Sequence, residues 1–213
     1  SHGTSHAGLV AAVGNNNNAL VGVAPETKIY AINAPVGCST GLDPSIPSTE
    51  ESILWSSGAD IDTLPKNNNP ADVIVVNIGK NTPCEPSLQR AINTAVDLGS
   101  IVVAPAWDSQ GIVSRTPGNC DNVITVGAHD IQGYYDTGIS AYGSQVDLAA
   151  PGGSKDGLQS LELVKQALFP GAPIVIPSDE LLDKTNMLVL TNENNYGRSS
   201  SAANAASVVG GVA

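Results

Sequence analysis

The sequence predicts an α/β domain in which a mainly parallel central sheet carries helices on both faces. Continuous runs of β-branched residues, such as ADVIVVNIG at 71–79, are typical of strands that are buried on both faces. Helical stretches separate these runs, as the crossovers of a parallel sheet require. The 213 residues, 41% of them hydrophobic, suffice for one domain with a sizeable core.

The first part of the chain is expected to supply two helices and one strand before that run. Residues 2–13 place small and apolar side chains at helical spacing until Gly14 and a run of asparagines break the pattern. A short strand is expected over 28–35 (KIYAINAP), which ends in a proline. Residues 49–59 (TEESILWSSGA) predict a helix, because a threonine and two acidic residues at its start suit a helix N-terminus.

The middle of the chain continues the alternation. Residues 86–99 (PSLQRAINTAVDLG) have the apolar spacing of an amphipathic helix that Gly99 stops. Three short apolar runs with strand composition follow this helix, at 100–107, 121–130 and 144–153. These segments are expected to extend the sheet that 71–79 begins.

The last part of the chain is expected to hold two helices and two short strands. Residues 158–169 are expected to be helical, and 199–213 predict a final helix built almost wholly from small residues. Two short strands are expected at 173–177 and 187–191. The chain is interpreted as a single domain over 1–213, with 155–186 as an insertion.

Charge and composition exclude several classes of function. Nine basic against twenty acidic residues give a net charge of −11, which argues against binding to nucleic acid or to an anionic membrane surface. No apolar run approaches the roughly 18 residues of a spanning helix. Few charged residues and many small polar ones suit a secreted protein. The three cysteines contain no CxxC pair, so a structural zinc site is not expected, and their spacing alone does not decide any pairing.

Four segments, in order along the chain, resemble the subtilisin-like serine peptidases. They are HGTSHAG (2–8), LVGVAPETKIYAINA (20–34), the strand-rich stretch 71–153 and YGRSSSAANAASVVGGVA (196–213). The resemblance implies the subtilisin-like three-layer α/β fold and hydrolysis of peptide bonds by a Ser/His/Asp triad. Such a triad needs an imidazole to take the proton of the serine and an acid to orient the imidazole.

The resemblance assigns two members of the triad to this chain. His2 takes the position of the general base, and Ser199 that of the nucleophile, with Ser200 as an alternative one residue along. A simpler reading is that the three consecutive serines only cap the last helix, which serine does well. In the family the acid lies on a strand upstream of the histidine. The chain is therefore expected to lack the segment that carries the acid, and to end within its last helix.

Two positions depart from the family in ways that bear on catalysis. Asp108 stands where the family has a side-chain amide that stabilises the oxyanion, and an ionised carboxylate donates no hydrogen bond. Trp107 stands where a glycine lines the pocket for the residue before the scissile bond, so an indole is expected to fill part of that pocket. The segment Asn77–Ile78–Gly79 resembles the strand edge to which the family's substrates pair.

Two further expectations come from the resemblance. The loop after the first helix resembles a calcium loop of the family, with Asn16 as the candidate ligand. Cys38 and Cys84 lie on loops that are bridged in some secreted members, which would leave Cys120 free or joined outside this chain. No cofactor is expected beyond this structural calcium.

The resemblance and its departures together predict a secreted subtilisin-like serine endopeptidase domain whose catalysis is impaired or lost. The alternative is a pseudoprotease that acts as a secreted binding or structural protein in an assembly. In both interpretations the partner is a peptide or protein, and nucleic acid and a membrane span are excluded.

Overall fold

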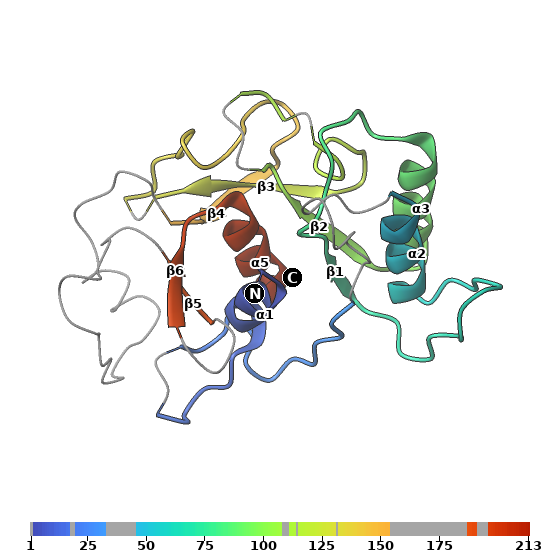
Figure 1. The fold of residues 1–213 in the computed structure, drawn as a ribbon, viewed down its shortest axis with the longest axis horizontal. Coiled ribbons are helices and arrows are strands. Elements are labelled where there is room, and N and C mark those ends of the chain that lie inside the picture. The colour runs from blue at the N-terminus through green and yellow to red at the C-terminus, as the bar shows by residue number, and fades with distance from the viewer. Residues whose placement is uncertain are drawn as a thin grey trace, which may run out of the picture.

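The computed structural model describes residues 2–17, 20–32, 46–107, 111–113, 115–130, 132–153, 187–190 and 196–213. Its centre is a parallel four-stranded sheet in the order β1-β2-β3-β4 (Figure 1). The strands are β1 (Val73–Val75), β2 (Ile101–Pro105), β3 (Ile124–His129) and β4 (Leu148–Pro151). The predicted α/β class with a parallel sheet is therefore confirmed.

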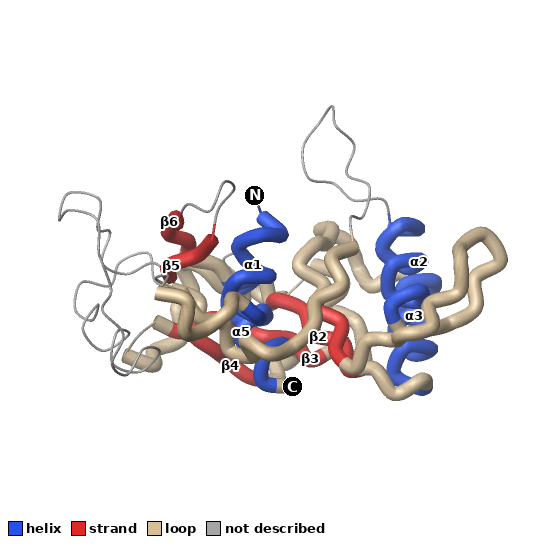
Figure 2. The backbone as a smooth tube through the Cα atoms, turned by 90° about the horizontal axis from the view of Figure 1, so that it is seen from below, coloured by secondary structure: helices blue, strands red, loops and turns tan. Residues whose placement is uncertain are grey.

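Helices cover both faces of this sheet. They are α1 (His2–Ala11), α2 (Ile46–Ser56), α3 (Pro86–Asp97) and α5 (Ala202–Val212). Helix α5 packs across all four strands and α1 packs against α5, whereas α2 packs against α3, which contacts β2. Figure 2 shows the α1–α5 and α2–α3 pairs at separate places along the molecule. The result is a three-layer arrangement, as the alternation of strands and helices predicted.

The side chains of β2 alternate between the two helical layers, as the period of two in a strand requires. Val102 and Ala104 belong to the apolar cluster that includes Leu88 and Ile92 of α3. Val103 belongs to the cluster on the α5 side, and all three β2 side chains are at most 1% exposed. Burial on both faces explains why the strand reads as a continuous apolar run.

Helix α5 packs through its backbone and small side chains. Residues 202–207 are all buried, and none has a side chain larger than asparagine. A Cβ atom added at Gly210 would overlap the side chain of Val75 on β1. Small residues therefore fill most of the contact between α5 and the sheet, and Gly210 has no room for a side chain.

Several predicted elements differ from the structure. The strand expected over 28–35 is wrong for the described residues 28–32, which form no strand and leave Ile29 and Tyr30 44% and 53% exposed. The run lacks a neighbouring strand in the described part of the chain, and β-branched composition alone cannot supply one.

The strand expected at 187–191 is present as β5 (Met187–Leu190). It pairs antiparallel with β6 (Tyr196–Ser199), which the sequence did not predict. The helix at 158–169, the strand at 173–177 and the insertion at 155–186 lie outside the described residues.

A disulfide joins Cys84 to Cys120, so the predicted Cys38–Cys84 bridge is wrong and Cys120 is not free. The Cα atoms of the bonded pair are 5.2 Å apart. The loop before α3 lies beside the turn that contains Cys120. A second contact joins the same two segments, since Asn119 Nδ2 donates a hydrogen bond of 2.9 Å to the carbonyl oxygen of Thr82. Residues 36 positions apart are thereby brought together, a proximity that no local sequence pattern signals. Cys38 lies outside the described residues.

Within the described ranges, every helix is too short or too polar to span a bilayer.

Candidate active site

His2 is the first residue of α1, and its side chain is exposed. Helix α1 packs against both α5 and β5 (Figure 1), which places it beside the hairpin that ends at Ser199. The predicted base and the predicted nucleophile therefore lie on neighbouring elements, although they are 197 positions apart in sequence.

His6 lies one turn along α1 from His2. The two Nε2 atoms are 3.2 Å apart, and the ring planes meet at 74°. His6 is only 8% exposed, and its Nδ1 atom has no hydrogen-bond partner within the described part of the chain. Burial, together with the neighbouring His2, lowers the pKa of His6 to about 4. His6 is thus a neutral imidazole near pH 7, directed at the ring nitrogen that a catalytic His2 would use.

The three consecutive serines occupy different structural positions. Ser199 is the last residue of β6, Ser200 is the connecting residue, and Ser201 is the N-cap of α5. The Ser201 hydroxyl accepts a hydrogen bond of 2.9 Å from the backbone N–H of Ala203, so this serine does cap the helix. Ser199 and Ser200 are both half-buried. A Cβ atom added at Gly153 would lie 3.0 Å from the Cα and Cβ atoms of Ser200, so Ser200 passes directly against the end of β4.

Asn204 fixes the backbone of this serine segment. Its side chain is fully buried, and Nδ2 donates to the carbonyl oxygens of Ser199 at 3.1 Å and Gly152 at 3.3 Å. The backbone N–H of Ser201 also donates to the Gly152 carbonyl oxygen, at 2.9 Å. The sequence analysis missed this residue. The available signal was that Asn204 is the one amide side chain in an otherwise small-residue helix.

Trp107 follows β2 and has a φ of +70°, in the left-handed region that favours glycine. The resemblance places a glycine of the family at this position, and that assignment stays a prediction. A Cβ atom added at Gly79 would lie 2.5 Å from Trp107 Cζ2, so the indole lies directly against the Gly79 backbone. The guanidinium carbon of Arg115 is 5.8 Å from the ring centroid. The buried indole N–H has no hydrogen-bond partner in the described part of the chain.

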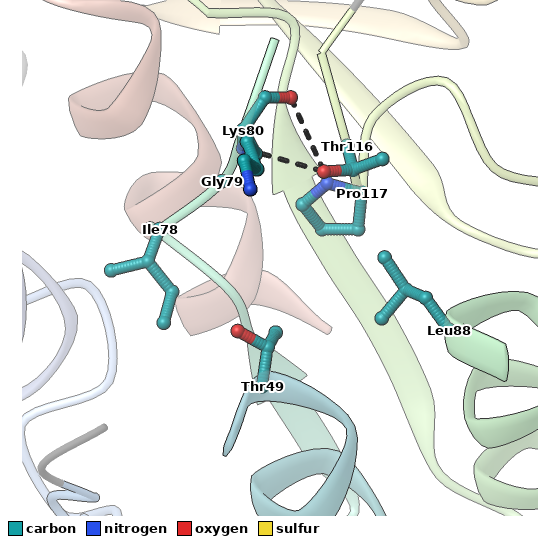
Figure 3. A pocket seen from close by; sticks show the side chains of 7 residues that line it. All are labelled: Thr49, Ile78, Gly79, Lys80, Leu88, Thr116 and Pro117. Atoms are coloured by element: carbon teal, nitrogen blue, oxygen red, sulfur yellow. Dashed lines mark hydrogen bonds between the residues drawn. The ribbon is translucent and has the colours of Figure 1, made fainter. Parts of the chain in front are cut away.

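The segment Asn77–Ile78–Gly79 leaves the sheet after β1 and lies between α5 and the turn at Thr116. Asn77 Nδ2 donates a hydrogen bond of 2.8 Å to the Ser207 hydroxyl on α5. Beyond Gly79, the backbone N–H of Thr116 donates to the Lys80 carbonyl oxygen at 3.0 Å. Figure 3 shows the small pocket beside this segment, into which α2 and α3 each direct one side chain. The pocket is lined by Thr49, Ile78, Gly79, Lys80, Leu88, Thr116 and Pro117.

Two predicted site residues receive no structural support. Asp108, at the oxyanion position, lies outside the described residues. Asn16 is exposed in a loop whose neighbours Asn15 and Asn17 both have a φ of +58°. The described part of this loop offers amide and carbonyl oxygens, which are hard ligands of the kind calcium prefers, but no carboxylate. Its residues 18–19 are not described, so calcium at Asn16 stays a prediction.

The chain is similar to known proteases, two of which are named as extracellular. The chain is 36% identical over 154 residues to an extracellular protease of Xanthomonas campestris pv. campestris, covering 72% of this chain and 26% of that protein. It is 38% identical over 152 residues to the extracellular basic protease of Dichelobacter nodosus, covering 71% of this chain and 24% of that protein. The chain thus spans about a quarter of the length of these two relatives.

The fold also matches solved structures. A protease structure from Pseudoalteromonas arctica superimposes with a TM-score of 0.78 and 32% identity, covering 99% of this chain and 56% of that one. The sequence profile described as the Subtilase family matches residues 1–213, the whole of the sequence. By its sequence and by its fold, this chain belongs to the subtilase family.

Proposed function

We propose that this chain forms the base- and nucleophile-bearing part of a secreted serine endopeptidase domain whose activity is reduced. The observation that carries the proposal is the packing of α1 against α5 and β5, because it brings the element that starts at His2 beside the hairpin that ends at Ser199. Extracellular proteases among the relatives support secretion.

The proposed reaction begins when Nε2 of His2 accepts the proton of the serine hydroxyl. The serine oxygen then attacks the carbonyl carbon of the peptide, and the imidazolium returns its proton to the leaving amine. Ser199 is the predicted nucleophile and Ser200 its alternative. Ser200 lies against Gly153 after the end of β4 and directly before the N-cap of α5. The acid that orients His2 would come from outside the described residues.

Three features support reduced activity. His6 Nε2 lies 3.2 Å from His2 Nε2 and competes with the serine for the same nitrogen. If Asp108 takes the oxyanion position that the resemblance implies, a donor is missing there, and loss of one such donor costs about 10²–10³ in rate. Trp107 lies against Gly79, in the space proposed for the substrate side chain before the scissile bond.

The proposed substrate is an extended peptide that pairs with the edge at Asn77–Gly79. A peptide added to an exposed edge gains affinity from backbone hydrogen bonds and specificity from side-chain pockets. Because the indole of Trp107 lies against Gly79, we expect a small residue before the scissile bond. A calcium ion at Asn16 remains part of the proposal as a stabiliser of the loop after α1.

The second candidate is a pseudoprotease that binds a peptide or protein without cleaving it. The neutral, buried His6 beside His2 and the indole against Gly79 favour this candidate, since both obstruct chemistry without disturbing the fold.

The two candidates differ in one measurement, the covalent labelling of the full-length protein by a fluorophosphonate followed by intact-mass analysis. The endopeptidase proposal expects one label per chain, lost in either Ser199→Ala or Ser200→Ala and retained in Ser201→Ala, which removes only the helix cap. Absence of labelling, while an active relative is labelled alongside, would refute the endopeptidase proposal and leave the pseudoprotease.

A further inference from the structure

The two histidines of α1 present ring nitrogens to each other on one face of the helix, four residues apart. We propose that Nε2 of His2 and Nε2 of His6 form a two-imidazole site for a divalent late transition-metal ion such as Zn²⁺. The binding itself rests only on this pair and is independent of the proposed function.

The separation of the two nitrogens fits a shared ion. Zn–N bonds are about 2.0–2.1 Å long, so two imidazole nitrogens of a tetrahedral site lie about 3.3–3.4 Å apart. The observed Nε2–Nε2 distance is 3.2 Å, and the ring centroids are 4.4 Å apart with the planes at 74°. Histidines at positions i and i+4 of a helix point to the same side, which is the spacing that helical zinc motifs use. An ion bound by both rings would lie to one side of the line that joins the two Nε2 atoms.

The environment of the pair is compatible with a metal. The contact between the two Nε2 atoms needs a proton on one of them, and an ion that binds both Nε2 atoms would displace this proton to Nδ1 of the same ring. Nδ1 of His6 is buried and has no hydrogen-bond partner among the described residues.

The site would be open. No group of three or more His, Cys, Asp or Glu side chains with metal-binding geometry occurs in the part of the chain that the structure describes. Water would complete the coordination of the ion, which reaches the pair through the exposed His2. Imidazole ligands suit Zn²⁺, Cu²⁺ and Ni²⁺, whereas calcium prefers oxygen ligands. If His2 is the general base, the bound ion occupies the nitrogen that accepts the serine proton, and zinc is a reversible inhibitor. This consequence alone rests on the proposed function.

The direct test is calorimetric titration with ZnCl₂ at pH 7.5. The amino group of Ser1 is blocked by acetylation, so that no free amino group next to His2 contributes a ligand. One Zn²⁺ per chain is expected. Removing a group that only hydrogen-bonds a metal ligand already weakens metal affinity about 10–100-fold. Removing a ligand itself, in His2→Gln or His6→Gln, should therefore weaken the affinity for Zn²⁺ by at least about tenfold. His129→Gln, at the third histidine, serves as the matched control and should bind as the parent does.

The outcomes separate this inference from the proposed function. His2 is exposed, so His2→Gln tests the site without disturbing the core, even if His6→Gln unfolds. An unchanged affinity in His2→Gln, or no binding by the parent protein at millimolar zinc, would overturn the metal site. Zinc binding without fluorophosphonate labelling would support the metal site and refute only the endopeptidase proposal. Labelling without zinc binding would refute the metal site and support the endopeptidase proposal.

Discussion

Comparing Trp107→Gly with Trp107→Ala separates two contributions of Trp107 to the free energy of unfolding. One is the strain of its backbone conformation, and the other is the packing of its side chain. Trp107 has a φ of +70°, and an L-residue in the left-handed region costs about 1–2 kcal/mol. Both substitutions delete the same indole contacts with Gly79 and Arg115 and the same buried, unpartnered N–H. Only the glycine substitution also removes the strain of holding a residue with a side chain at a positive φ.

The expected difference follows from two opposing quantities. Relief of the left-handed backbone stabilises Trp107→Gly by about 1–2 kcal/mol relative to Trp107→Ala. The greater freedom of glycine in the unfolded chain offsets about 0.5–1 kcal/mol of this. We therefore expect Trp107→Gly to be more stable than Trp107→Ala by about 1 kcal/mol, which corresponds to about 2–4 °C in Tm for a domain of this size.

Urea unfolding followed by circular dichroism measures this difference. Ala106→Gly is the matched control, because Ala106 is fully buried and has no positive φ, so glycine should destabilise the protein there. If Trp107→Ala proved as stable as Trp107→Gly or more so, the argument from backbone strain would be refuted. Peptide libraries would then test the indole directly. Under the proposed endopeptidase function, Trp107→Gly should accept larger residues before the scissile bond, and an unchanged preference would contradict the proposed place of Trp107 in that pocket.

Three further outcomes are expected. Cys84→Ser should lower the free energy of unfolding by about 4 kcal/mol, the loop-closure value for a bridge between residues 36 positions apart, and reduction of the parent should cause a loss of the same size. Because the folded pKa of His6 is lowered to about 4 from 6.5, its contribution to stability is complete above pH 6.5. The contribution is lost as the pH falls toward 4, since the unfolded chain takes up the proton first, and the loss amounts to about 3 kcal/mol. A pH series of urea midpoints should show this slope in the parent and not in His6→Leu, and equal slopes would contradict the burial of a neutral imidazole. Gly210→Ala should destabilise by about 1–3 kcal/mol through overlap with Val75, and a Tm equal to that of the parent would show that α5 can shift away from the sheet.

The sequence predicted those elements whose patterns are local. The strand around Val102 is buried on both faces, so its sequence is a continuous apolar run. Helix α3 is buried on one face, so its apolar residues, such as Leu88 and Ile92, recur at helical spacing. Residues 28–32 carry an equally apolar composition and form no strand, because a strand also needs a neighbour to pair with.

The candidate site shows the same limit. His2 and the serine run could be proposed from resemblance, because each lies in a short motif. The pairing of Cys84 with Cys120 could not, since it depends on how the loop at Thr82 meets the turn at Asn119. The contact between His2 and His6 follows from helical spacing, but the burial that keeps His6 neutral depends on the packing of α1 against the rest of the fold.

The construction of α5 limits how this protein could be adapted. A helix that meets the sheet through methyl groups and bare backbone has no long side chains whose rotamers could absorb a displacement. We therefore expect α5 to move together with β1 or β4 when either strand shifts. Ser199 and Ser200, which lead directly into that helix, would move with it. Sequence variation is consequently expected to accumulate in the loops around Trp107 and Thr116, while the residues of α5 that face the sheet should tolerate few substitutions.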